Sequence, residues 1–491
     1  MMNQGMNNEK PVRPRSIKIN AILNGTKTLF SLIFPLISIP YVTRVLGVEN
    51  LGKYNFCLSI SNYFSLLASL GVSTYAIREG SQYRNNKEKI NRFTSEILSI
   101  NLVSTVIAYF VLWALLLLVP RLRQDKSIIL ILSSSIIFVT VGCEWVFSIY
   151  EDYLFLTLRT IGFQLCSLIL LFVLVHNRDD VRNYAFVTAI SSILIGVTNT
   201  IARRKYVTTR VTISRALCKH IKPILILFTS NVATILYVNS DVTMLGFLSS
   251  EYHIGLYSVS TKVYSLFKQI LSAIIIVSIP RLSFLVINNV GEYKKLCRKI
   301  INVLILCTAP IITGIFIFSG SIIKLIAGGD FSESVPSLRI LSIALMFCVI
   351  GWFYTSCVLI PKKDEGKVLK ITLIAAIVNI GINFFLIPLL HEVAAALTTM
   401  IAELISMVLS MMQGYKYTGN ILEKRNVWTT LIADASIILI SCVIRSFGMN
   451  YIIELMITVF LSALSYCLIL YMFHNEIFLT YCTEIKYKLG K

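Results

Sequence analysis

Long apolar stretches alternate with short polar segments along most of the chain. Fourteen of these stretches are poor in charge and about 20 residues long, which is the length that a helix needs to cross a bilayer. They are continuous and lack the alternation of transmembrane strands, so we predict helices. The predicted helices cover residues 17–43, 54–77, 97–119, 127–149, 154–175, 184–201, 223–247, 255–279, 299–319, 337–360, 368–388, 393–412, 428–447 and 451–473.

One motif occurs twice, about 200 residues apart. The first copy covers residues 44–79 and the second covers residues 244–281. Both copies contain a Leu-Gly pair, a later glycine followed two residues on by a tyrosine, and an arginine 24 residues after that tyrosine. Such an internal repeat in an apolar chain is typical of transporters built from two related halves.

The repeat and the polar segments predict an all-α, polytopic protein with two pseudo-symmetric lobes of six helices each. The N-terminal lobe is expected at residues 1–201 and the C-terminal lobe at residues 223–412. The basic segment 202–222 is predicted to be a cytoplasmic linker between them, and residues 413–491 hold an appended helix pair and a tail.

Composition and charge placement agree with a membrane protein. Hydrophobic residues make up 56% of the chain and charged residues only 14%, against about 25% in a soluble domain. The net charge of +20 does not indicate nucleic acid binding. With the N-terminus inside, 32 of the 45 Lys and Arg residues fall in inside segments and 10 in outside loops. We therefore predict a multi-pass protein of the bacterial inner membrane, with both termini cytoplasmic and lipid headgroups as contacts.

Metal ions and cofactors are not expected. The eleven cysteines are scattered without a C-x-x-C pair, and the five histidines show no metal-ligand spacing. Cysteine as a small apolar side chain within helices explains this distribution.

Five basic residues are candidate contacts for an anionic substrate. Lys27, Lys262 and Lys268 lie within predicted helices, where a charge is costly and therefore functional by default. For Lys27, a side chain that extends to the membrane interface is the alternative. Lys268 is deep, has no evident acidic neighbour in the sequence, and is the strongest candidate. Arg78 and Arg281 end equivalent helices of the two halves, where guanidinium groups could bind a diphosphate.

Three carboxylates within predicted helices are candidates for ion coupling. Glu144 could form an internal ion pair or act on substrate or protons. Asp241 lies at a depth similar to that of Lys262, so an ion pair between them is a prediction, and protonating Asp241 would then release the lysine. Glu403 ends a run of small residues, 394–403, that suits close helix packing.

Several motifs resemble one transporter family. They are Pro-Tyr-Val-Thr-Arg-Val-Leu-Gly followed by Leu-Gly-Lys-Tyr (40–54), Arg78-Glu79-Gly80, Glu144-Trp145-x-Phe147 with Glu151-Asp152-Tyr153 and Arg159, and the run 394–403. Across residues 20–409 the chain resembles the O-antigen and capsule repeat-unit flippases of the multidrug/oligosaccharidyl-lipid/polysaccharide exporter (MOP) superfamily. It departs from that pattern at Ser148-Ile149, where Gln-Gly is expected, and at Glu144, where Asp is commoner.

The resemblance implies two six-helix lobes around a central cavity and a specific cargo. That cargo is a polyprenyl-diphosphate-linked oligosaccharide, moved from the cytoplasmic to the outer leaflet by alternating access. The lysines would offset phosphate charge in a wet cavity, and the arginines would gather phosphate at the inner mouth. A polysaccharide polymerase and assembly proteins are candidate partners.

Two other classes of function were weighed. A cation-coupled multidrug exporter of the same superfamily would need an acidic cavity, whereas three lysines here favour an anionic cargo. A membrane polysaccharide polymerase or glycosyltransferase would need an acidic metal motif or a large outer loop. No Asp-x-Asp occurs, and the predicted outer loops have about 18 residues at most. We therefore do not expect an enzyme.

Overall fold

The computed structural model describes residues 17–489, and these residues form helices joined by short connections, with no strand among them. Twelve stretches are long and apolar enough to cross a membrane. Two of the twelve contain a kink that separates two helices, at Gly47 and at His391. The prediction of an all-α polytopic protein is confirmed. Residues 1–16, at the N-terminus that we predict to be cytoplasmic, lie outside the described residues.

The chain divides into two compact units, each built from two separate segments. Unit 1 contains the residues up to Ser38 together with Ile60–Val232, and unit 2 contains Ile39–Ser59 and Ala233–Lys491. The helices that contribute to both units are α1 (Ile17–Ser69) and α10 (Cys218–Leu248).

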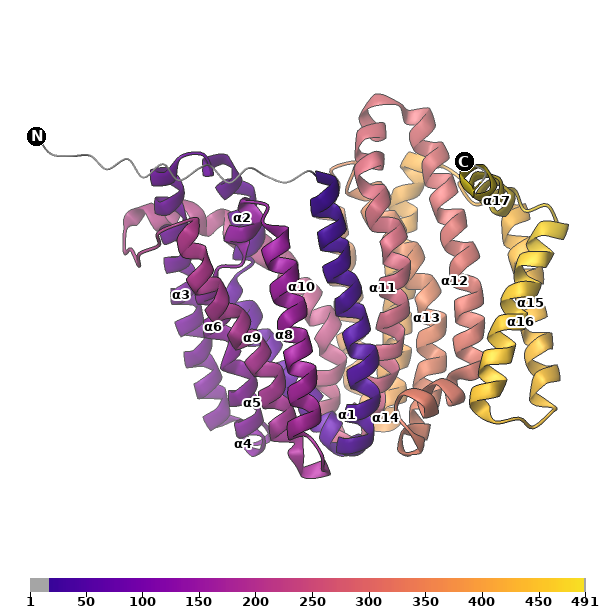
Figure 1. Ribbon diagram of the computed structural model, residues 1–491, viewed down its shortest axis with the longest axis horizontal. Helices are drawn as coiled ribbons and strands as arrows, with labels where there is room; N and C mark the ends of the chain where they lie inside the picture. Colours follow the sequence, from indigo (N-terminus) through magenta and orange to yellow (C-terminus); the bar gives the residue numbers. More distant parts are fainter. Residues whose placement is uncertain (1–16, 490–491) are drawn as a thin grey trace, which may run out of the picture. The chain divides into compact units, whose positions relative to one another are not determined.

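Unit 1 is a bundle in which α9 packs against α5, α6 and α8, while α3 packs against α6 (Figure 1). The predicted helix at 127–149 is divided into α5, α6 and α7. The break between α6 and α7 lies at Cys143, which has a left-handed backbone (φ 45°). The helices of unit 1 alone are α2 (Val72–Tyr83), α3 (Lys87–Leu118), α4 (Pro120–Gln124), α5 (Lys126–Ser133), α6 (Ser135–Gly142), α7 (Trp145–Ile149), α8 (Tyr153–Leu174) and α9 (Val181–Ala202), with short 3₁₀ turns at Arg178–Asp180, Arg203–Lys205 and Arg215–Leu217.

Unit 2 is organised around α13, which packs against α11, α12 and α14. The pair α15–α16 packs on α12 (Figure 1). A final helix, α17, was not predicted from the sequence. The helices of unit 2 alone are α11 (Glu251–Asn288), α12 (Val290–Ile326), α13 (Val335–Phe353), α14 (Glu365–Thr418), α15 (Lys424–Arg445), α16 (Tyr451–Met472) and α17 (Glu476–Leu489), with a 3₁₀ turn at Gly329–Ser334 and a π-helical turn at Tyr354–Leu359.

The glycines of the repeated motif have structural roles in unit 2. Gly47 kinks α1 with φ 72°, a conformation that suits glycine, and the helix continues directly after it. The connection expected between the predicted helices 17–43 and 54–77 is therefore a single-residue kink within α1. Gly52 and Gly255 are the equivalent glycines of the two copies. Gly52 of α1 lies against α11, and Gly255 of α11 lies against α1. A Cβ on Gly52 would lie 1.8 Å from the Glu251 carbonyl oxygen, and one on Gly255 would lie 2.1 Å from the Val48 carbonyl oxygen.

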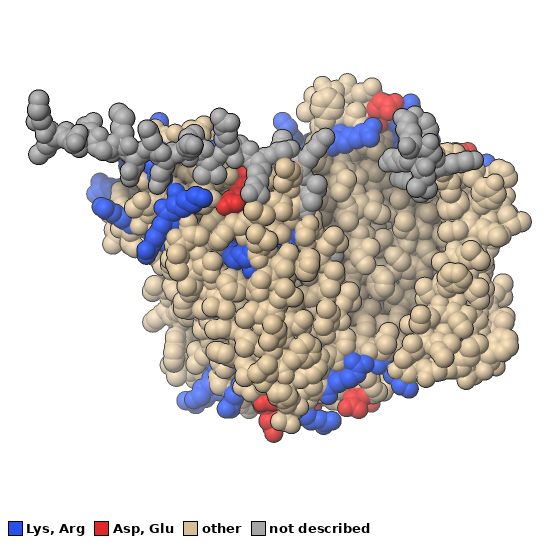
Figure 2. All heavy atoms as spheres, viewed as in Figure 1, with Lys and Arg blue, Asp and Glu red and all other residues tan. Residues whose placement is uncertain are grey.

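The surface agrees with a lipid-facing position of the helices. Figure 2 shows, on the face it presents, most charged residues near the upper and lower edges and mainly other residues between them, apart from a Lys or Arg patch nearer the middle on the left. Large apolar side chains such as Phe110 on α3 and Leu439 on α15 are exposed rather than buried. Exposed apolar side chains on this scale are expected on a surface that contacts the hydrocarbon of a bilayer rather than water.

Candidate functional site

The first candidate site is an ion cluster in unit 1, the Glu144 cluster, formed by Lys27, Glu144, Arg159 and Asn199. Glu144 follows the break at Cys143, and its carboxylate accepts hydrogen bonds from Lys27 Nζ (3.5 Å) and Arg159 Nη2 (3.0 Å). Arg159 also donates to the Asn199 side chain. The Arg159 side chain is only 3% exposed, whereas 44% of the Glu144 side chain is exposed.

This geometry decides one alternative that the sequence left open. Glu144 forms an internal ion pair, as a charge within an apolar bundle requires. Lys27 does not simply extend to the interface, because its ammonium contacts the Glu144 carboxylate. Trp145 and Phe147, which follow Glu144 in the motif, are buried in the apolar core of unit 1 and have a packing role.

The second candidate site is the Glu403 cluster in unit 2, which consists of Lys268, Glu403, Tyr264 and Trp352. Lys268 Nζ lies 3.5 Å from Glu403 Oε1, and Tyr264 donates to the same oxygen (3.2 Å). The Lys268 ammonium also lies 5.6 Å from the ring centre of Tyr264 and 5.9 Å from that of Trp352. The expectation that Lys268 has no acidic neighbour was wrong, because Glu403 lies on another helix, α14.

The third candidate site is the Asp241 cluster in unit 2. The buried Asp241 carboxylate accepts hydrogen bonds from Tyr257 (2.6 Å), Asn383 (2.6 Å) and Thr399 (2.5 Å). Within the described range, no Lys or Arg lies at ion-pair distance from this carboxylate. The Asp241–Lys262 pair expected from sequence is therefore absent from the described residues. Three neutral donors partly compensate a buried charge, which leaves the site suited to a proton or a cation.

The remaining basic candidates are more exposed. Lys262 on α11 is exposed and has no hydrogen-bond or ion-pair partner among the described residues. Arg281, at the cytoplasmic end predicted for the same helix, is exposed and lines a cleft of about 470 Å³ with Lys295 and Lys299. Arg78 belongs to unit 1, is 60% exposed and pairs with the adjacent Glu79 (3.1 Å).

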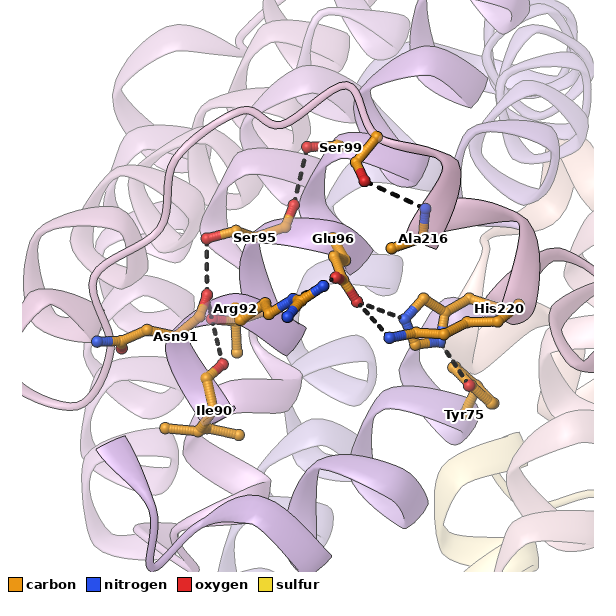
Figure 3. Close-up of polar contacts among 12 residues, drawn as sticks. Tyr75, Ile90, Asn91, Arg92, Ser95, Glu96, Ser99, Ala216 and His220 are labelled. Carbon is orange, nitrogen blue, oxygen red and sulfur yellow. Dashed lines mark hydrogen bonds and ion pairs between the residues drawn. The ribbon is translucent and has the colours of Figure 1, made fainter. Parts of the chain in front are cut away.

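A buried polar network at α3 was not predicted from the sequence (Figure 3). Glu96 of α3 accepts from Arg92 (3.0 Å), Lys219 (3.0 Å) and His220 (2.9 Å). The other ring nitrogen of His220 lies 2.7 Å from the Tyr75 hydroxyl. A buried carboxylate with several cationic donors is typical of a structural anchor, and this one holds the start of α10 on α3.

The chain before α10 is also bound to α3. Backbone N–H groups at Thr208, Arg210 and Thr212 donate to the side chains of Asn91 (2.9 Å), Ser95 (3.0 Å) and Ser99 (2.8 Å). The acceptors are four residues apart on α3, which is a rise of about 6 Å along the helix. The donors are two residues apart in an extended segment, which is a rise of about 6.6 Å, so donors and acceptors are spaced alike. Figure 3 shows the three α3 side chains in a row along the helix.

Several residues of these clusters were not among the predicted site residues: Arg159, Asn199, Tyr257, Asn383, Thr399 and Glu96. Arg159 and Tyr257 belong to motifs that the sequence showed, so their positions gave a usable signal. The polar residues Asn383 and Thr399 resemble ordinary helix-packing side chains in sequence. The part of the chain that the structure describes holds no group of three or more His, Cys, Asp or Glu side chains suited to a metal ion.

The fold has clear relatives among solved structures. It is similar to the lipid II flippase MurJ in an inward closed conformation, with a TM-score of 0.72, 18% identity, and coverage of 93% of this chain and 99% of that chain. It is also similar to a multidrug resistance MATE family transporter of the MOP superfamily in its inward-facing conformation, with a TM-score of 0.60, 12% identity, and coverage of 82% and 98%. At these identities the likeness concerns the fold.

Sequence relatives point in the same direction. The chain is 23% identical over 404 residues to a protein of Escherichia coli (strain K12) named "Putative O-antigen transporter", with coverage of 81% of this chain and 95% of the relative. It is 24% identical over 382 residues to the capsular polysaccharide biosynthesis protein CapF of Staphylococcus aureus, with coverage of 75% and 91%. Residues 17–286, more than half of the chain, match the family described as "Polysaccharide biosynthesis protein". This chain belongs to the polysaccharide biosynthesis protein family.

Proposed function

We propose that this protein is a flippase that moves polyprenyl-diphosphate-linked oligosaccharide repeat units from the cytoplasmic to the outer leaflet, by alternating access, for surface polysaccharide biosynthesis. One observation carries the proposal. The chain aligns over most of its length with a relative named as an O-antigen transporter, and it covers 95% of that relative. These relatives are named as transporters or biosynthesis proteins, and the chain is a multi-spanning helical protein.

Charge within the spanning segments supports an anionic cargo. Lys262 lies well inside the span Glu251–Asn288, is exposed, and has no partner among the described residues. An unpaired ammonium that faced hydrocarbon would cost several kcal/mol, so a wet, substrate-facing position explains it better. Lys262 is our first candidate contact for a phosphate.

Lys27 and Lys268 can each exchange their glutamate partner for a phosphate of the substrate. Each ammonium lies 3.5 Å from its glutamate, longer than the roughly 2.7–2.9 Å of a strong charge-assisted hydrogen bond. Each lysine side chain is also partly exposed, at 27% and 31%. A diphosphate could therefore replace or share the carboxylate partner. Arg78 lies within α2 and Arg281 within α11, rather than at the helix ends expected from sequence. Both are exposed, and they are proposed to attract the diphosphate before it enters.

Asp241 is the proposed carrier of a coupling ion, because it is buried and has only neutral hydrogen-bond donors among the described residues. Glu144 and Glu403 are secondary candidates, since both are already paired with a lysine. If Asp241 carries the ion, Asp241→Asn should make glycan export independent of the proton and sodium gradients. Normal gradient-dependent export by this variant would exclude the role.

The proposed location is the bacterial inner membrane with both termini cytoplasmic. The support is the excess of Lys and Arg in alternate segments of the sequence. Reporter fusions at the two ends, active only in the cytoplasm or only outside it, test this orientation directly.

The test of function uses glycan export by the host after deletion of the gene. Complementation with the wild-type chain should restore surface glycan. Lys27→Ala with Lys268→Ala should reduce export by more than about ten-fold, because each lost charged contact is worth about 1.5–3 kcal/mol. Lys126→Ala, at an exposed lysine at the start of α5, is the matched control. Export at wild-type level in the double variant would refute the cationic site.

A further inference from the structure

A groove in unit 1 is not explained by the ion clusters alone. Its volume is about 780 Å³, and it runs along α8 beside the C-terminal end of α9. Apolar side chains of α8, among them Phe155, Leu158 and Phe163, form most of its lining. Gly162 widens it, because a Cβ at this position would meet nothing within 4 Å.

The length of the groove matches one leaflet. The lining residues on α8 extend from Leu154 to Cys166, and twelve residues of helix rise about 18 Å. Half of a typical hydrocarbon core is about 15 Å thick. One acyl chain, running parallel to α8, would therefore fill the groove from the interface towards the bilayer middle.

The polar end of the groove carries a lysine without an ion-pair partner in the described range, beside the Asp152 carboxylate, which also lines the groove. Lys205 lines this end, is exposed, and has no carboxylate partner among the described residues. Its ammonium lies 5.7 Å from the ring centre of Tyr206. The nearby Asp152 carboxylate is engaged by the Tyr206 hydroxyl, at 2.6 Å. A phosphate at this end would find a free ammonium.

The side of the groove carries a buried donor without an acceptor. Arg159 lines the groove, and its side chain is only 3% exposed. Its two terminal nitrogens bond to Asn199 and Glu144, but Nε has no hydrogen-bond partner within the described range. An unsatisfied buried donor costs about 1–3 kcal/mol, so an acceptor oxygen supplied by a ligand would be stabilising.

We propose that this groove is a binding site for an anionic glycerophospholipid, with one acyl chain along α8, the phosphate at Lys205 and an ester carbonyl oxygen accepting from Arg159 Nε. Length, charge and the unpaired donor each match a different part of such a lipid. Because Arg159 also belongs to the Glu144 cluster, the bound lipid would contact the residue that orients Glu144. The proposal rests on the membrane position of the protein and does not require the proposed cargo.

The test is lipid binding to the purified full-length protein in detergent, measured by native mass spectrometry. Phosphatidylglycerol and phosphatidylcholine with identical acyl chains are the two probes. We expect one phosphatidylglycerol to bind about five-fold more tightly than phosphatidylcholine, since one lysine near the surface contributes about 1 kcal/mol. Lys205→Gln should abolish this preference, and Lys205→Arg should retain it.

A second set of variants tests the acyl-chain part of the groove. Gly162→Leu, which fills the groove, and Leu158→Gln, which makes it polar, should both weaken binding of the two lipids. Leu158 is 62% exposed, so its replacement leaves the core of unit 1 intact. Gly320→Leu on α12 is the matched control, because a Cβ there also meets nothing within 4 Å.

Three results would overturn the proposal. They are equal binding of both lipids by the wild type, unchanged binding by the groove variants, and displacement of phosphatidylglycerol by a polyprenyl diphosphate, which would assign the groove to the cargo. None of these readouts depends on transport, so a failed lipid site and a failed flippase function can be distinguished.

Discussion

The Glu144 cluster allows a test of whether Glu144 is energetically coupled to Lys27 and Arg159 as an ion pair or whether these charges act independently. Glu144→Gln removes the only carboxylate that contacts both Lys27 and Arg159 in the described residues. Breaking a fully buried pair costs about 3–5 kcal/mol. Because 44% of the Glu144 side chain is exposed, we reduce that value and expect about 2 kcal/mol.

The measurement is thermal unfolding of the purified protein in one detergent at one scan rate. For a unit of about 200 residues, 1 kcal/mol corresponds to about 2–4 °C, so Glu144→Gln should lower the apparent Tm by about 4–8 °C. Glu88→Gln is the matched control, because Glu88 is exposed and has no ion-pair partner among the described residues. The control should shift the apparent Tm by less than about 2 °C.

A double-mutant cycle completes the test. If Glu144 and Arg159 are coupled, the variant with both Glu144→Gln and Arg159→Gln should be more stable than the sum of the two single effects predicts, by about 1–3 kcal/mol. Additivity within about 0.5 kcal/mol would mean that the two side chains act independently, and the ion-pair interpretation would be wrong.

Three further predictions concern other parts of the chain. Gly255→Ala should lower the apparent Tm, because its Cβ would lie 2.1 Å from the Val48 carbonyl oxygen, while Gly320→Ala should not; equal melting of both variants would contradict the packing argument. Lys262→Ala should reduce glycan export without changing the apparent Tm, since its ammonium has no partner in the described range; unchanged export would remove Lys262 from the site. Hydrogen bonds from Lys367 and Tyr417 lower the pKa of Asp364. The ionised Asp364 carboxylate therefore stabilises the folded protein above about pH 4, and this stabilisation is lost as the pH falls through the lowered pKa. The Tm advantage of the wild type over Asp364→Asn, followed from pH 6 to pH 3, should therefore shrink at the acidic end, and a growing difference would contradict this sign.

The sequence by itself determined where the helices lie and which charges fall inside them. Hydropathy located the stretches that can cross a membrane, because a stretch without charge that is long enough to cross a bilayer has no stable alternative in lipid. It also singled out Lys27, Lys268, Asp241 and Glu144, because ionisable residues are rare in such stretches. The repeat was recognised as well, although the packing of Gly52 against Gly255 that explains its glycines was not.

Only the tertiary structure decided which of these charges meet. Lys268 pairs with Glu403 on α14, and Asp241 bonds to Tyr257, Asn383 and Thr399 rather than to Lys262. Depth along a helix can be counted in residues, but contact between helices depends on how each helix is rotated about its axis and which neighbour it packs against. Those quantities follow from the packing of many side chains at once, and a hydropathy pattern does not contain them.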